Sequence, residues 1–364
     1  MSYLLGIETA NPQYCIDQGD LATFYCNALN EPDAQITKKI NVIAKKSGIK
    51  HRYSVISDYS KKPEDFSFFA RNKYLEPMPG LTERMAVYKQ EALGLSLAAV
   101  NKIQNFEKIR RQITHIITVT CTGLFAPGLD IELIKALNLN PGTNRSSINF
   151  MGCNAAILAV KQADQICKGD PSALVLIVCT ELCTIHVQKR YTDDYILSNL
   201  LFSDGAAAAL IGPKKQMIHD QYTPLKIKSF QSVIIHEGHN DMAWQLSETG
   251  FIMNLTSYVS GHINKNIPGL LHKMGIMQKD IEHWAIHPGG KKILDDFCMT
   301  MKLDNTQLAH SYSVLENYGN MSSPTILFVL QQLLASKQVK KKELIYAAAF
   351  GPGLSIESAL FEHA

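Results

Sequence analysis

A weak internal repeat constrains the fold of this chain more than any other feature of its sequence. In the first half, a strand-like segment at 115–123 precedes an expected helix at 130–139. Residues 146–153 then lead into a second expected helix at 154–169. Two more strand-like segments follow. Short strands that alternate with helices in this way indicate an α/β fold.

The second half repeats this order with nearly the same spacing. A strand-like segment at 282–290 precedes an expected helix at 291–303, and residues 310–320 lead into another helix at 321–337. Two apolar strand-like segments again close the half. Because the repeating unit is a whole half-domain, the pattern indicates an ancient duplication rather than a solenoid.

A polar segment at 213–224 separates the two repeats. We therefore expect an N-terminal half at 1–222 and a C-terminal half at 223–364, related by pseudo-symmetry. A chain of 364 residues is long enough for two fused halves around a large core.

Four reactive or polar residues lie at equivalent strand-to-helix corners of the repeat. Cys153 follows Cys121 by 32 residues, and Asn320 follows His287 by 33. Equivalent corners of a pseudo-symmetric pair face one another, so these side chains are expected to converge on one pocket. Such a position, at the carboxyl ends of strands, is typical of sites in α/β folds.

Cys153 is the candidate nucleophile of this set. A free cysteine is usually a small buried hydrophobic residue, but this one stands where a strand becomes a helix. The partial positive charge of a helix N-terminus lowers the pKa of a thiol, and a nearby histidine lowers it further. We therefore expect a thiolate paired with His287.

No paired carboxylate accompanies these residues in the sequence, which limits the chemistry. A cysteine, a histidine and an asparagine suit acyl transfer through a thioester. They also suit carbon–carbon bond formation in which loss of CO2 creates the carbanion. That step needs hydrogen-bond donors at the enolate oxygen, and His287 and Asn320 can supply them.

Composition excludes several other classes of protein. The net charge of +3 gives no reason to expect a nucleic-acid or membrane partner, and the longest apolar run, 173–179, is too short to span a bilayer. The N-terminal residues resemble no signal peptide, and eight cysteines then indicate reduced thiols, so we expect a cytoplasmic protein. We expect no metal site, because the cysteine and histidine spacings match no metal motif.

The motifs HPGG, YGNMSSP and FGPG, in this order, carry a clear resemblance to a known family. The chain resembles type III polyketide synthases, the chalcone and stilbene synthase family of the thiolase superfamily. GIETANP, KSGIKHRY, LLFSDGAAAALIG and HPGGKKILD extend the resemblance nearly from end to end. It implies a thiolase-like fold with a layered αβαβα core, and NFMGCNAA and TCTG are closer to bacterial members.

The resemblance implies roles for individual residues. Cys153 matches the nucleophile that holds the acyl chain, and His287 and Asn320 match the pair that promotes decarboxylation and stabilises the enolate. Phe202 matches a gatekeeper between the coenzyme A tunnel and the cavity. Two further residues are expected to line the pocket, Cys121 and Ser322.

Four cavity positions depart from the plant members of the family. Met253 stands in place of a second gatekeeper phenylalanine, Trp244 in place of a small residue, His186 in place of a threonine and Ser198 in place of a glycine. Since His186 and Trp244 are bulky, we expect a small cavity, few extensions and a separate tunnel for any long starter.

Basic residues are expected to hold the phosphates of coenzyme A. Lys39 and Lys46 match two of the family's basic positions, whereas the third falls on Val42. We expect Lys292, just after HPGG, to compensate, and this expectation comes from the residues rather than from the family.

The resulting hypothesis is an acyltransferase that condenses malonyl-CoA repeatedly onto an acyl-CoA starter and closes a pyrone or phenolic ring. Coenzyme A thioesters are its substrates, and no cofactor is expected. The family implies a homodimer, although Ala126 replaces the methionine that plant members extend across the interface. The alternatives are a single condensation of the ketoacyl synthase III kind and an inactive acyl-CoA-binding or scaffold protein of the same fold.

Overall fold

The computed structural model describes residues 1–30, 33–213, 223–256 and 259–364 of the chain. Its strands are β1 (Tyr3–Ala10), β2 (Tyr14–Asp17), β3 (His51–Ser54), β4 (His115–Thr120), β5 (Asn144–Asn149), β6 (Val175–Leu182), β7 (Asp204–Gly212), β8 (Leu225–Ile234), β9 (Met242–Ser247), β10 (Gly250–Leu255), β11 (His283–Ile286), β12 (Leu344–Gly351) and β13 (Ser355–His363). Its helices are α1 (Gln18–Asn27), α2 (Ala34–Lys46), α3 (Leu81–Val100), α4 (Phe106–Ile109), α5 (Leu129–Ala136), α6 (Ala155–Gly169), α7 (Asp193–Leu201), α8 (Val259–Lys273), α9 (Lys291–Met301), α10 (Ala309–Tyr318) and α11 (Thr325–Ala335).

The strand pairing repeats between the two halves. In the first half β4 and β6 are parallel, while β6–β7 and β7–β1 are antiparallel; in the second half β11–β12 are parallel, while β12–β13 and β13–β8 are antiparallel. The halves meet where β1 pairs with β8, at Tyr3 opposite Lys226 and Leu4 opposite Leu225. This repeat confirms the two pseudo-symmetric halves.

One element breaks the symmetry. Nine strands from the two halves form one mixed sheet in the order β11-β12-β13-β8-β1-β7-β6-β4-β5, and among the described residues β2 pairs with β3 and β9 with β10 in two small separate sheets. β5 pairs in parallel with β4 at one edge of the sheet, but the corresponding segment of the second half forms the helix α10, so β11 is the opposite edge.

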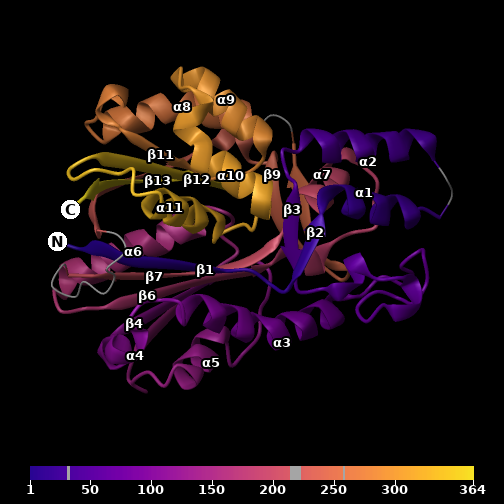
Figure 1. Ribbon diagram of the computed structural model, residues 1–364, viewed down its shortest axis with the longest axis horizontal. Coiled ribbons are helices and arrows are strands. Elements are labelled where there is room, and N and C mark those ends of the chain that lie inside the picture. Colours follow the sequence, from indigo (N-terminus) through magenta and orange to yellow (C-terminus); the bar gives the residue numbers. More distant parts are fainter. Residues whose placement is uncertain (31–32, 214–222, 257–258) are drawn as a thin grey trace.

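Helices and strands alternate in five layers (Figure 1). The central helices α6 and α11 pack with the inner faces of both groups of strands in one core cluster. A second cluster joins the outer face of the first half to α3 and α5, and a third joins the outer face of the second half to α8 and α9. The expected αβαβα arrangement is therefore confirmed.

The sequences of the central helices fit this burial. α11 carries the run Ile326–Leu330, which is buried on all sides of the helix, as expected for a helix with protein all around it. α6 instead buries small residues, among them Ala155, Ala156 and Ala159, which let the strands approach closely. Both helices begin beside the candidate site, because Cys153 precedes α6 and Asn320 precedes α11.

A group of N-terminal elements extends the molecule beyond the layered core. In Figure 1, α1, α2, β2 and β3 lie together with α7 at one end. The buried guanidinium of Arg52 on β3 donates from Nη1 to the main-chain oxygens of Asn199 (2.9 Å) and Phe202 (2.5 Å). These bonds fix the end of α7, and with it the position of Phe202.

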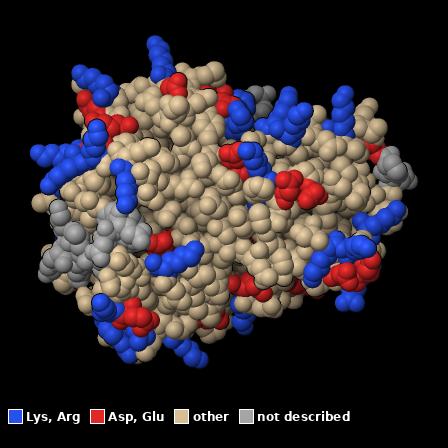
Figure 2. Space-filling model, viewed as in Figure 1, with Lys and Arg blue, Asp and Glu red and all other residues tan. Residues whose placement is uncertain are grey.

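Basic and acidic side chains are interspersed over the face of the molecule seen in Figure 2, in keeping with the small net charge. Within the described ranges, no helix is long and apolar enough to cross a membrane. The expected division between residues 222 and 223 borders 214–222, which lie outside the described residues, so this division stays a prediction.

Candidate active site

Cys153 lies in the short connection between β5 and α6, two residues before the helix begins at Ala155. The preceding Gly152 has φ +88°, and a Cβ there would stand 2.1 Å from Cδ of Pro352. Only glycine allows this close approach. The thiol is buried, with 6% of Cys153 exposed.

His287 follows β11 and is almost wholly buried, at 1% exposure. Its main-chain N–H donates to the carbonyl of Ala348 on β12 (2.8 Å), which extends the parallel pairing by one residue. Neither ring nitrogen has a hydrogen-bond partner among the described residues. The imidazole is therefore held in place by its backbone and by packing, with both nitrogens available to a ligand.

Asn320 links the two halves at the site. Its main-chain N–H donates to the carbonyl of Leu201 (3.1 Å), and its carbonyl accepts from the N–H of Ser203 (2.9 Å). Its side-chain Oδ1 accepts from the N–H of Ser322 (2.8 Å) and lies 4.0 Å from Sγ of Cys153. The side-chain NH2 group is not used in these bonds.

These three residues line one cavity of about 280 Å³, called here the triad cavity. Phe202, Met253 and Gly289 are also among its walls. The structure thus brings together Cys153, His287 and Asn320, as the repeat predicts. The duplication places them there from separate loops of the two halves.

The protonation of the site differs from expectation. Burial raises the pKa of the Cys153 thiol to about 11, although hydrogen bonds to Ser322 and Asn320 act in the opposite direction. Burial also lowers the pKa of the His287 imidazole to about 3. The expected thiolate–imidazolium pair and lowered thiol pKa are therefore wrong for this structure, because loss of hydration outweighs the helix N-terminus.

A buried carboxylate lies beside the site, so the statement that none accompanies the set is also wrong. Oε2 of Glu181 accepts from the N–H of Cys121 (2.8 Å) and the hydroxyl of Thr122 (2.8 Å), and Oε1 accepts from the hydroxyl of Ser323 (2.6 Å). Its charge contributes to the raised pKa of Cys153. Glu181 is the one charged residue of the otherwise largely apolar strand β6, and this contrast is a signal in the sequence.

Cys121 and Ser322 line a second cavity of about 340 Å³ with Cys153, called here the thiol cavity. The Sγ of Cys121 accepts from the N–H of Gly152 at 3.1 Å. Ser322 has φ +60°, which turns the chain sharply after Asn320. Both residues therefore lie where the sequence places them, next to the candidate nucleophile.

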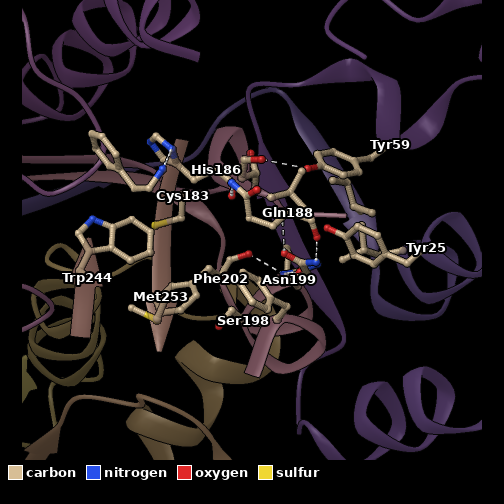
Figure 3. Close-up of a pocket in the computed structure, with 17 residues that line it drawn as sticks. Tyr25, Tyr59, Cys183, His186, Gln188, Ser198, Asn199, Phe202, Trp244 and Met253 are labelled. Atoms are coloured by element: carbon tan, nitrogen blue, oxygen red, sulfur yellow. Dashed lines mark hydrogen bonds between the residues drawn. The ribbon is translucent and has the colours of Figure 1, made fainter. Parts of the chain in front are cut away.

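The remaining cavity residues surround a larger space of about 550 Å³, called here the distal cavity. It shares part of its wall with the thiol cavity: Cys183, Phe202, Trp244 and Met253. Figure 3 shows Trp244 and Met253 at one end of this space, and Tyr25 and Tyr59 at the other. The distal cavity, which His186 and Trp244 both line, is larger than the spaces next to Cys153, so the expected small cavity stays a prediction.

His186 and Trp244 are fixed by hydrogen bonds. Nε2 of His186 donates to the carbonyl of Thr122 (2.7 Å), and its Nδ1 accepts from the N–H of Phe251 (3.1 Å), which defines a neutral tautomer. The imidazole also stacks on the Phe251 ring at 4.2 Å. Nε1 of Trp244 donates to the carbonyl of Cys121 at 2.8 Å. Both side chains are therefore rigid walls.

The other candidate on this wall, Ser198, lines the distal cavity from α7. Its hydroxyl oxygen is buried and has no hydrogen-bond partner among the described residues. All the expected cavity residues thus line the distal cavity, the thiol cavity or both.

A surface groove of about 940 Å³ lies next to the triad cavity, with which it shares Gly289 and Ile293. Lys46 at the end of α2 and Lys292 at the start of α9 both line it. Lys39 does not; it forms an ion pair with Asp193 instead. The structure thus brings two of the three expected basic residues to the groove.

Comparison with known proteins agrees with this geometry. The model of the N-terminal domain of chalcone and stilbene synthases matches residues 1–215, and the model of the C-terminal domain matches 226–363. The alpha-pyrone synthesis polyketide synthase-like Pks18 of Mycobacterium tuberculosis is 29% identical, over 98% of this chain and 90% of that protein. A putative chalcone synthase of Bacillus subtilis is 28% identical, over 99% and 98%. The crystal structure of the C-terminal type III polyketide synthase domain of Steely1 from Dictyostelium has a TM-score of 0.89 at 29% identity, covering 100% of this chain and 99% of that one.

Proposed function

The chain belongs to the chalcone and stilbene synthase family and is a type III polyketide synthase, and we propose that it extends an acyl starter held on Cys153. The observation that carries this proposal is the convergence of Cys153, His287 and Asn320 on one buried cavity. Such enzymes are acyltransferases that use malonyl-CoA and acyl-CoA starters.

The first step is transfer of the starter to the enzyme. The Cys153 sulfur attacks the thioester carbonyl of the acyl-CoA, and its proton passes to a ring nitrogen of His287, which has no competing partner among the described residues. Coenzyme A leaves as the thiol and takes up that proton. Because burial keeps both groups neutral, proton transfer accompanies the attack rather than preceding it.

The second step is decarboxylation of malonyl-CoA in the same cavity. The C–C bond to the carboxylate breaks, CO2 leaves and the electron pair forms an enolate on the thioester. A neutral His287 can donate N–H to the enolate oxygen, and the NH2 group of Asn320 can donate a second hydrogen bond. The low pKa of about 3 keeps the imidazole neutral over the physiological range.

The enolate carbon then attacks the acyl group on Cys153, the carbon–sulfur bond to the cysteine breaks, and a chain extended by two carbons forms on coenzyme A. The released sulfur takes up a proton that is drawn from solvent, which restores the thiol. Repetition followed by ring closure gives a pyrone or phenolic product. Similarity to a protein named for alpha-pyrone synthesis favours the pyrone. Lys46 and Lys292 in the surface groove, with Lys39 nearby on α2, would bind the coenzyme A phosphates.

The test is incubation of the purified protein with malonyl-CoA and a panel of acyl-CoA starters, without any carrier protein, and analysis of the products by mass. We expect cyclised products of at least two extensions. A single condensation that requires an acyl carrier protein would instead identify a ketoacyl synthase III-like enzyme. The absence of acyl-enzyme and product with every starter would support the inactive binding protein.

We also propose that the enzyme acts as a homodimer in the cytoplasm. The eight cysteines are all free, which suits a reducing compartment. Exposed apolar residues, Leu124 and Met151, lie close in sequence to Cys121 and Cys153, beyond the ends of the edge strand β5 and its neighbour β4. A second copy covering them would shield the site. Light scattering coupled to size exclusion should give twice the chain mass.

A further inference from the structure

A further, partly open space lies behind the distal cavity. This rear chamber has a volume of about 380 Å³, and the surface that it exposes is apolar. Residues that line it without lining the distal cavity include Ala28, Ile40, Leu75, Met78 and Ile196. The family roles described above use none of these residues.

A thin wall divides the two spaces. Four residues line both: Tyr25, Val187, Gln188 and Asn199. Hydrogen bonds hold two of these side chains in place. The side-chain NH2 of Asn199 donates to the carbonyl of Gln188 (2.7 Å), and Nε2 of Gln188 donates to the carbonyl of Thr249 (2.9 Å). Tyr25 contributes the largest side chain of the wall.

Tyr25 stands across the path of a chain that starts at Cys153. The thiol cavity lies next to the distal cavity, and Cys183 and Met253 line both of them. In Figure 3, Tyr25 lies at the end of the distal cavity remote from Met253, and its ring comes from α1. The ring is buried and packs edge-on against Phe24, with centroids 5.7 Å apart.

We propose that Tyr25 is the end stop of the acyl cavity and sets the greatest length of linear aliphatic starter that the enzyme accepts. This inference rests on the proposed function. A starter that fits ends at the ring, and each further methylene must displace a side chain in a close-packed interior. Behind the ring, the rear chamber offers apolar walls that would stabilise a longer chain if the ring were absent.

The experiment measures kcat/KM for saturated acyl-CoA starters of graded length, with malonyl-CoA as extender and product masses as the readout. Tyr25→Ala joins the two spaces, so starters just beyond the wild-type limit should gain about tenfold or more in kcat/KM, since pockets discriminate single methylenes by such factors. Tyr25→Phe keeps the ring and should keep the wild-type limit.

Two further variants separate the end stop from a general loosening of the fold. Met78→Ala enlarges the rear chamber but leaves the wall intact, so its limit should equal that of the wild type. Ala28→Trp, added to Tyr25→Ala, refills the chamber and should restore the shorter limit. Tyr25→Leu also removes the ring but loses less side-chain volume, and it replaces Tyr25→Ala if that variant does not fold.

The outcomes distinguish this inference from the proposed function. A folded Tyr25→Ala or Tyr25→Leu protein with the wild-type limit would overturn the end stop while leaving polyketide synthesis intact. A gain with Met78→Ala equal to that with Tyr25→Ala would also overturn it. A wild-type protein that condenses no starter with malonyl-CoA would refute the proposed function itself.

Discussion

The two halves of the protein place chemically different groups on equivalent loops. In the first half, the loops after β4 and before α6 carry the thiols of Cys121 and Cys153; in the second half, the loops after β11 and before α11 carry the nitrogen groups of His287 and Asn320. The framework is repeated, but the hydrogen bonding is not. The Cys121 sulfur accepts a main-chain N–H, whereas the His287 ring has no partner among the described residues. The repeat thus supplies the positions, and in the proposed mechanism the difference between the halves divides the chemistry into a carrier of the acyl group and donors to the enolate.

The largest effect is expected when the two thiols, Cys121 and Cys153, are compared by substitution. Cys153→Ala should abolish product formation, a loss of at least about a thousandfold in kcat/KM, because no other group can carry the acyl chain. Cys121→Ala should retain activity within about tenfold, since the expected role of Cys121 is only to line the pocket. Product mass and intact-protein mass after addition of starter measure both effects. An acyl adduct on Cys153→Ala would contradict the assignment of the nucleophile.

The pH dependence of alkylation tests whether burial, rather than the helix N-terminus, determines the pKa of the Cys153 thiol. With a pKa of about 11 for Cys153, the thiolate fraction, and with it the iodoacetamide rate at this residue, should rise about tenfold per pH unit between pH 7 and pH 10. The site-specific rate is read by peptide mass spectrometry, with Cys153→Ala as the control. A rate that is already constant near pH 7 would instead reveal the thiolate–imidazolium pair.

The second half is tested by removing its donors. Asn320→Ala should slow decarboxylation of malonyl-CoA by about a hundredfold to a thousandfold, the usual effect of losing one donor to a developing oxyanion. Transfer of the starter to Cys153 should continue, because the nucleophile is intact. Measuring CO2 release and acyl-enzyme formation on the same sample separates the two. An equal loss in both steps would contradict the separate roles assigned to the two halves.

The smallest effects are expected at the surface groove. Lys46→Ala should raise KM for malonyl-CoA by a few-fold, as for an exposed ionic contact, with little change in kcat. Lys39→Ala should raise it less, because Lys39 lies outside the groove and pairs with Asp193. Steady-state kinetics at low and moderate salt check this order. A larger effect at Lys39 would instead indicate that the coenzyme A phosphates bind closer to α7.

The sequence predicts the parts of this structure that follow from spacing. The order of elements and the matched intervals from Cys121 to Cys153 and from His287 to Asn320 were enough to anticipate both the paired halves and the cavity between them. Local pattern suffices there because each half folds by the same strand-to-helix alternation. The family motifs then added the lining residues, such as Trp244 and Met253.

The errors have a common physical cause, which is contact between segments that lie far apart in the sequence. A helix N-terminus next to Cys153 is visible in the sequence, but the loss of water around the thiol depends on segments more than a hundred residues away. The same is true of Glu181, whose partners Thr122 and Ser323 come from both halves. The Lys39–Asp193 pair likewise joins distant segments. Desolvation and ion pairing depend on the tertiary structure. The spacing of residues in the sequence therefore predicts where a group lies but not whether it is charged.

The main-chain bonds of Asn320 to Leu201 and Ser203 have a consequence for assembly. These bonds belong both to the contact between the halves and to the loop that presents the Asn320 amide. A molecule whose halves dock out of register therefore loses the amide altogether instead of holding it in a weaker position. Correctly assembled molecules should be fully active and misassembled ones inactive. The specific activity of a preparation would then be proportional to the fraction of its molecules in which the two halves dock correctly.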